Sequence, residues 1–269
     1  MVVQVKIVKW IIIAMLLNAS WVMGAVGPGG AVSIIQNYPE LRRAAPGGGG
    51  GTPTLVQVNH QEGGTLNAIA ESFGSNNTAG NMLWLAVTGY DTPGPCTVDT
   101  IADTALNTWT VIHSSGNTDN LNNMLATAYA KNVAGGANTV TVTLDAGCQS
   151  AVTLTIQEWS GLDTAAPLTF SNADSGTSSN AGSGAMTAPA GTKLILGAVT
   201  DAAGGAQTIS TLNDHALHAR STDGDTYWHF AASSFGGYSS NTITAGVVYA
   251  SSFTLGGTNA WTGQGAMFK

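Results

Sequence analysis

The sequence predicts an all-β protein, an antiparallel two-sheet sandwich of the jelly-roll or concanavalin-like kind. Short apolar runs with a period of two recur along the chain, and the clearest is 139–144, where Val and Leu alternate with Thr. Clusters of Gly, Ser, Asn and Pro separate these runs, as turns require. The only helix candidate is 118–128, which is too short to define another fold class.

Each expected strand has its own pattern. The run 81–88 is largely apolar and predicts a central, buried strand. The run 139–144 predicts a half-buried strand that follows a tight reversal at Gly135-Gly136. In 151–159, alternation places Glu158 on the apolar face and Trp159 on the opposite face. The expected strands, in chain order, are 55–58, 81–88, 108–112, 126–131, 139–144, 151–159, 194–200, 226–232, 241–250 and 259–268.

Charge is scarce and unevenly distributed. Only 9% of the 269 residues are charged, and the formal net charge is −7. Beyond the glycine run, four basic residues stand against fourteen acidic ones. A nucleic-acid-binding surface needs a basic patch, and an anionic membrane repels an acidic domain. The composition therefore excludes nucleic acid as a partner and disfavours binding of the domain to anionic membranes.

The amino terminus predicts export. Lys6 and Lys9 precede an apolar run that ends before Asn18, and small residues follow at Gly24 and Ala25, so residues 1–24 are expected to be a secretory signal peptide. A retained membrane span is the competing interpretation, but the run is shorter than a bilayer requires. We therefore expect a secreted or cell-surface protein.

Three segments are expected in the chain. Residues 1–24 form the signal peptide, 25–53 a flexible Gly/Pro-rich linker with a short apolar segment at 31–35, and 54–269 the β-sandwich domain. The segment 31–35 is interpreted as part of a spacer. The alternative is a strand that completes the sheet of a neighbouring subunit.

The two cysteines predict one disulfide. Cys96 and Cys148 both lie in turn-rich segments of the exported domain. An even number of cysteines in an oxidising compartment is typical of a structural disulfide.

Several motifs resemble those of a group of uncharacterised exported bacterial β-sandwich proteins. They are Gly80-Asn-Met-Leu, Ala102-Asp-Thr-Ala-Leu-Asn-Thr-Trp109, Ala130-Lys-Asn-Val-Ala-Gly-Gly-Ala-Asn-Thr-Val-Thr-Val142, Glu158-Trp-Ser-Gly-Leu162 and the stretch from Trp261 to Phe268-Lys269. Leu106 stands where these proteins usually carry Gly, and Trp109 and Trp159 replace Tyr. The resemblance spans most of residues 54–269. It implies architecture and export, and it brings no catalytic residues.

Acidic residues give the weak catalytic candidates. Glu158 shares a face with apolar residues, and a carboxyl group buried in a cleft can serve as an acid catalyst. Asp163 or Asp201 would supply the second carboxylate that glycoside hydrolysis needs. The alternative is that Glu158 accepts hydrogen bonds at a turn near the end of its strand.

Aromatic and histidine residues give the binding candidates. Trp159, Trp228 and Tyr227 are candidates for stacking on a sugar if they are exposed. The metal candidates are the loop carboxylates Asp223 and Asp225 and the histidines His215, His218 and His229. No cofactor is expected, and Ca²⁺ bound by loop carboxylates stays open as an alternative.

The sequence thus favours a secreted, non-enzymatic β-sandwich for surface attachment and adhesion, glycan binding or extracellular assembly. Its expected partner is an extracellular glycan or cell-surface component, and a homo-oligomer is compatible with it. One alternative is a carbohydrate-active glycoside hydrolase on a concanavalin-like sandwich. Another is a self-polymerising subunit of an extracellular filament.

Overall fold

A computed structural model describes most of the compact unit Tyr38–Lys269. The described residues are 51–63, 67–91, 96–116, 123–145, 148–202, 209–211, 216–220, 228–235 and 242–269. The predicted signal peptide, the segment 31–35 and most of the linker lie outside them. All regular elements in the described part are strands, and all their pairings are antiparallel, which confirms the predicted fold class. No helix in this part is long and apolar enough to cross a membrane.

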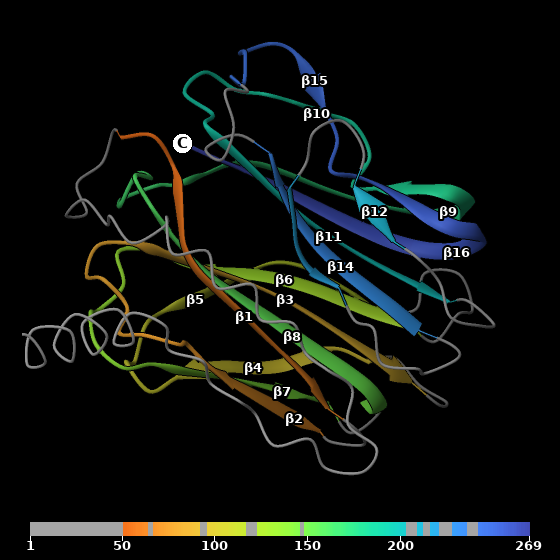
Figure 1. The fold of residues 1–269 in the computed structure, drawn as a ribbon, viewed down its shortest axis with the longest axis horizontal. Coiled ribbons are helices and arrows are strands. Elements are labelled where there is room, and N and C mark those ends of the chain that lie inside the picture. The colour runs from red at the N-terminus through yellow and green to blue at the C-terminus, as the bar shows by residue number, and fades with distance from the viewer. Residues whose placement is uncertain are drawn as a thin grey trace, which may run out of the picture. The chain divides into compact units, whose positions relative to one another are not determined.

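Sheet A, with five strands, is central (Figure 1). Its strands, in spatial order, are β1 (Thr54–Gly63), β8 (Cys148–Ser160), β3 (Met82–Asp91), β6 (Asn123–Ala130) and β5 (Trp109–Gly116). Residues 81–89 are all buried, so the apolar run expected to form a central strand does so. The helix candidate 118–128 was wrong where it can be judged, because residues 123–128 belong to β6.

Sheet B packs against one face of sheet A (Figure 1). Its strands, in spatial order, are β2 (Ala68–Ser72), β7 (Thr139–Leu144) and β4 (Val98–Asp103). Alternate residues of β7 are buried, as its sequence predicts. The expected Gly-Gly hairpin was wrong, however. The strands β6 and β7 lie in different sheets, so residues 131–138 carry the chain from sheet A to sheet B.

Sheet C packs against the other face of sheet A (Figure 1), and it adds a third layer to the sandwich. Its strands are β12 (Ser210–Thr211), β16 (Ser252–Phe268), β11 (Leu194–Ala202), β14 (Trp228–Phe235) and β13 (Ala216–Arg220), with β9 (Leu168–Gly182) on the far side of β16. A two-stranded ribbon, β10 (Met186–Thr187) with β15 (Val248–Tyr249), completes the set.

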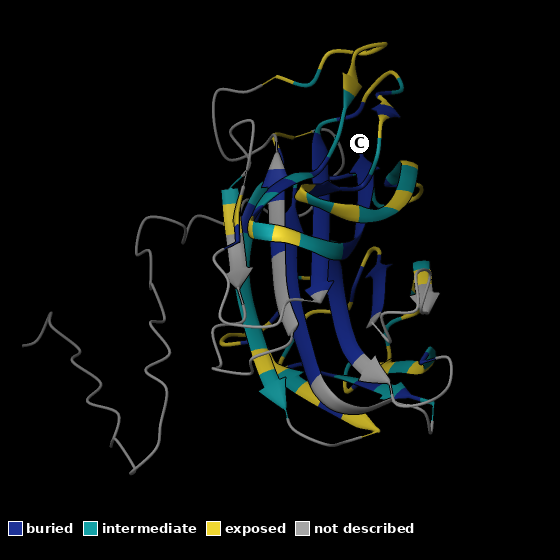
Figure 2. Ribbon diagram, turned by 90° about the vertical axis from the view of Figure 1, so that its right-hand side faces the viewer, coloured by how far each residue is buried: buried dark blue, intermediate teal, exposed yellow. Residues whose placement is uncertain are grey.

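The core therefore has two main parts, one on each face of sheet A. Figure 2 shows the inner strands buried along most of their described length. On the face toward sheet B, aliphatic residues such as Leu83, Val142 and Leu154 pack together. On the face toward sheet C, larger rings take part, including Trp84 and Trp159. Alternation along β3 and β8 sends successive side chains to these two different cores.

Candidate functional site

Glu158 accepts four hydrogen bonds inside the protein. Its side chain is 0% exposed. Oε1 accepts from the backbone N–H of Thr78 (2.7 Å) and from Asn81 Nδ2 (2.6 Å). Oε2 accepts from Gln57 Nε2 (2.6 Å) and from Asn77 Nδ2 (2.9 Å). A carboxylate has about four lone-pair sites, so this one is saturated.

This saturation explains how the Glu158 carboxylate is buried with no basic side chain beside it in the described part of the chain. Charge-assisted hydrogen bonds compensate for much of the lost hydration. The ladder between β1 and β8 is irregular between Leu55 and Gln57, which brings the Gln57 side chain to the carboxylate. A substrate could neither reach this carboxylate nor find a free lone pair on it. One backbone N–H and three side-chain amides donate to Glu158, so the geometry favours the interpretation of Glu158 as a hydrogen-bond acceptor near the end of its strand over the catalytic one.

Asp201, one suggested partner of Glu158, lies elsewhere. It is 0% exposed and accepts a hydrogen bond from Asn259 Nδ2 (3.0 Å). Alternation along β11 places Asp201 on the side of Val199, which packs on the face of sheet C turned away from sheet A. Glu158 lies on the face of sheet A turned toward sheet B. Stacked sheets are about 10 Å apart, so these two carboxylates cannot flank one glycosidic bond.

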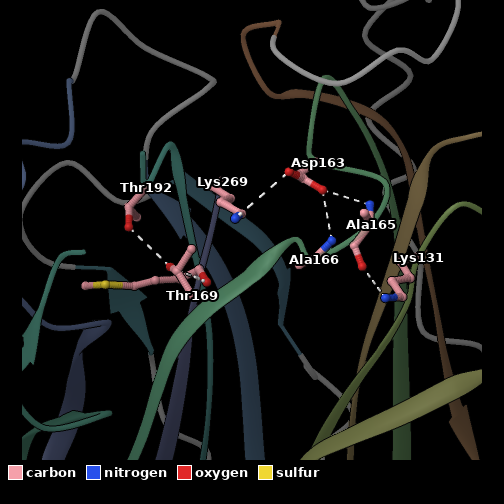
Figure 3. Close-up of polar contacts among 8 residues, drawn as sticks. Lys131, Asp163, Ala165, Ala166, Thr169, Thr192 and Lys269 are labelled. Carbon is pink, nitrogen blue, oxygen red and sulfur yellow. Dashed lines mark hydrogen bonds and ion pairs between the residues drawn. The ribbon is translucent and has the colours of Figure 1, made fainter. Parts of the chain in front are cut away.

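Asp163, the other suggested partner, organises a turn at the surface (Figure 3). Its Oδ1 accepts from the backbone N–H groups of Ala165 (2.7 Å) and Ala166 (2.9 Å), and Lys269 Nζ lies 4.0 Å from its Oδ2. The N–H groups of Ala166 and Ala165 hold the pKa of Asp163 below its usual range. Lys131 Nζ donates to the carbonyl of Ala165 in the same turn. The carboxylate therefore fits a turn-stabilising role.

Asp103, one of the loop carboxylates for which the sequence leaves Ca²⁺ open, forms a second hydrogen-bonding centre. It is 7% exposed and accepts from the backbone N–H (2.9 Å) and side-chain Nδ2 (2.8 Å) of Asn107. Trp109 Nε1 (3.1 Å) and Asn138 Nδ2 (3.3 Å) also donate to it. Asp103, Asn107, Trp109 and Asn138 all belong to the motifs that carry the resemblance.

Three loops are joined around these two carboxylates, and we call them the loop platform: residues 74–81, 104–108 and 131–138. Asn77 and Gly136 exchange two backbone hydrogen bonds of 2.8 and 3.0 Å. Asn107 Oδ1 accepts from the backbone N–H of Ala134 at 2.8 Å. Asn138 Oδ1 accepts from the hydroxyl of Thr104 at 3.2 Å. Each loop is thereby bonded to another loop. Glu158 in β8 and Asp103 in β4 anchor the three loops to sheets A and B.

The exposed side of the loop platform is nearly free of charge. Its exposed residues are Gly74, Ser75, Asn76, Ala79, Thr104, Leu106, Thr108, Lys131, Asn132, Ala134, Gly135 and Ala137. Leu106 stands out because it is 90% exposed and has a φ of 58°. This left-handed conformation costs a non-glycine residue about 1–2 kcal/mol. A strained, projecting apolar side chain is a feature that folding alone does not explain.

The aromatic binding candidates have different outcomes. Trp159 is 0% exposed, and its Nε1 donates to Gln157 Oε1 at 2.8 Å, so its ring is part of the core and cannot stack on a ligand. Trp228 begins β14, but its side chain lies outside what the structure describes, and so does Tyr227. Trp109, which was not a binding candidate, is partly buried beside the loop platform, and its Nε1 donates a hydrogen bond to Asp103.

The metal candidates fall almost wholly outside the described part. Asp223, Asp225 and His215 are outside the described residues. His218 and His229 lie in β13 and β14, with side chains that are not described. Among the residues that can be examined, no group of three His, Cys, Asp or Glu side chains could hold a metal ion.

The fold and this geometry define a class of protein: an antiparallel, three-layer β-sandwich with a rigid loop platform at one end of two sheets. Comparison with protein-family models, curated proteins and solved structures finds no match for the chain.

Proposed function

We propose that the protein is an exported, non-enzymatic binding protein whose loop platform attaches to an extracellular glycan. The observation that carries the proposal is the pair of buried carboxylates, Glu158 and Asp103, whose described partners are neutral donors that fix three loops. A surface held in advance loses little conformational entropy when it binds.

The chemistry of the platform favours a neutral, polyhydroxylated ligand. Its exposed residues offer hydroxyl and amide groups at Ser75, Asn76, Thr108 and Asn132, which can exchange hydrogen bonds with sugar hydroxyls. Leu106 adds an apolar contact for the C–H face of a sugar. The acidic balance of the domain disfavours nucleic acid and anionic membranes as partners.

Burial of Glu158 and Asp201 favours binding over hydrolysis. Glycoside hydrolysis needs two accessible carboxyl groups that face one another across the bond. Glu158 and Asp201 are fully buried, in different layers. The filament alternative rests on residues 31–35, which lie outside the described part.

Export and a Cys96–Cys148 disulfide belong to the same proposal. Cys96 is 1% exposed, and its Sγ would lie 3.5 Å from a Cβ placed on Gly89 in β3. Cys148 pairs with Asp91 at the end of the same strand. No free cysteine occurs in the described part. Intact-mass measurement before and after reduction, with alkylation, tests the bond, and two alkylatable thiols without reductant would refute it.

Binding of the full chain to a glycan array and to insoluble polysaccharides tests the function. We expect Leu106→Gly to weaken binding by about tenfold or more, since each 1.4 kcal/mol of lost contact is a factor of ten. Val248→Ala is the matched control, because Val248 is 59% exposed on β15, away from the platform. The proposal fails if no glycan binds, or if both variants weaken binding equally.

A further inference from the structure

The two faces of sheet A differ sharply in polarity. Apart from Glu158, which is bonded to the loop platform, the side chains of β3, β6 and β8 in the core toward sheet B are apolar. The interface toward sheet C contains buried hydroxyl and amide side chains among its rings. These are Thr88, Thr127, Thr153, Thr155, Gln157, Thr200, Thr262 and Gln264. A polar interface between packed layers is stable only where its groups find hydrogen-bond partners.

One part of this interface is satisfied by direct bonds between the sheets. Thr88 Oγ1 donates to Thr200 Oγ1 at 3.0 Å. Thr127 Oγ1 donates to Gln264 Oε1 at 2.9 Å, and Gln264 Nε2 donates to the carbonyl of Leu125 at 2.6 Å. These contacts tie β3 and β6 of sheet A to β11 and β16 of sheet C.

In a second part of the interface, the described residues leave three polar groups without a hydrogen-bond partner. Trp84 Nε1, Thr155 Oγ1 and Gln157 Nε2 are buried and have no hydrogen-bond partner among the residues that the structure describes. All three residues are 0% exposed. A polar group left unpaired in the interior lacks the hydrogen bonds that water gives it in the unfolded chain, so each such group destabilises the fold.

The three residues that carry these atoms are neighbours on one face of sheet A. Trp84 and Gln157 are directly opposite each other in the ladder of β3 and β8, and Thr155 is two residues from Gln157, on the same side of β8. The orientation of the Gln157 amide is fixed, because its Oε1 accepts from Trp159 Nε1 at 2.8 Å. Its Nε2 must therefore donate to something else.

We propose that Trp84, Thr155 and Gln157 form an internal hydration site between sheets A and C. One water molecule matches the chemistry: it accepts from Trp84 Nε1 and Gln157 Nε2, and it donates to Thr155 Oγ1. Three bonds is the usual number for a buried water. His60 is opposite Thr155 on the edge strand β1, and its side chain is 33% exposed, so the site lies one strand from solvent.

Two isosteric substitutions in the full chain test the site. Thr88→Val removes a hydroxyl with protein partners, and we expect the Tm to fall by about 2–5 °C. If water binds at the site, Thr155→Val also removes a satisfied hydroxyl, so the Tm should fall by a similar amount. If the hydroxyl is unpaired, its removal relieves a desolvation cost, and the Tm should be unchanged or rise.

A direct measurement accompanies the variants. In the protein with ¹⁵N-labelled tryptophan, the indole N–H of Trp84, assigned with Trp84→Phe, should show cross-relaxation with a long-lived water. A lower Tm for Thr155→Val together with this cross-peak supports the hydration site. A Tm at or above that of the wild type, or no cross-peak, overturns it.

Discussion

At the scale of single residues, buried carboxylates hold the loops of this protein in place. Glu158 and Asp103 accept hydrogen bonds from amides, an indole and backbone N–H groups, and the donors come from segments that are distant in the sequence. Removing the charge should therefore loosen the loops as well as weaken individual bonds.

Glu158→Gln tests this role of the carboxylate. The new amide would turn an N–H group toward the existing donors, so we expect a loss of roughly 3 kcal/mol in the free energy of unfolding, measured with urea. Glu62→Gln is the control, because Glu62 lies on the edge strand β1 and is only partly buried. A loss no larger than that of the control would contradict the role assigned to Glu158.

Leu106 carries a second prediction at this scale. Leu106→Gly removes the left-handed strain of a side chain with a φ of 58°, and after the entropic cost of glycine we expect a gain of ~0.5–1 kcal/mol in the free energy of unfolding. Leu106→Ala retains the strain and should give no such gain. Equal stabilities for the two variants would show that the conformation at this position costs nothing.

At the scale of elements, periodicity predicted most of the strands of the central sheet and missed several strands outside it, including β2, β4 and β9. The strand β7 matches its predicted range because Val and Thr alternate over a half-buried face. The strand β9 was missed because its sequence is rich in Ser, Asn and Gly, and its side chains are mostly intermediate or exposed. Its long ladder with β16 holds it in place, and such pairing leaves no hydrophobic pattern in the sequence.

Local patterns also could not tell which strands share a sheet. The Gly135-Gly136 segment has the composition of a hairpin turn, yet it links two sheets and pairs with Asn77. The saturation of Glu158 depends on donors at positions 57 to 81, which meet it only through tertiary packing. The sequence therefore predicted the face of Glu158 but could not choose between its two roles.

Close packing between β9 and β16 in sheet C gives a prediction about glycine at this contact. A Cβ on Gly263 would lie 2.2 Å from the carbonyl oxygen of Gly182, so Gly263→Ala should lower the free energy of unfolding by about 3 kcal/mol or more. Gly74→Ala is the matched control, since the nearest atom would be 3.9 Å away. Similar urea midpoints for the two variants would show that the crossing is looser than described.

At the scale of the whole molecule, three layers share one central sheet, and the two interfaces differ. The interface toward sheet B is mostly apolar, while the one toward sheet C contains hydrogen bonds between the sheets, such as Thr88–Thr200. Sheet C should therefore respond more to changes in hydrogen bonding than sheet B does. One titratable group, His113 on the edge strand β5, is paired in register with Thr127, whose hydroxyl bonds to sheet C.

The pH dependence of stability tests the role of His113. Burial lowers the pKa of His113 from its usual 6.5, and no described residue makes a hydrogen bond to its buried Nε2. The unfolded chain therefore binds a proton at a higher pH than the folded protein does. This difference lowers the free energy of unfolding as the pH falls below about 6.5, until the folded pKa is reached.

Urea unfolding of wild type and His113→Asn between pH 7.5 and about 5 measures the effect, since the variant should lose less stability over this range. Parallel profiles would mean that other groups carry the pH dependence, and that His113 takes up its proton in the folded protein as readily as in the unfolded chain.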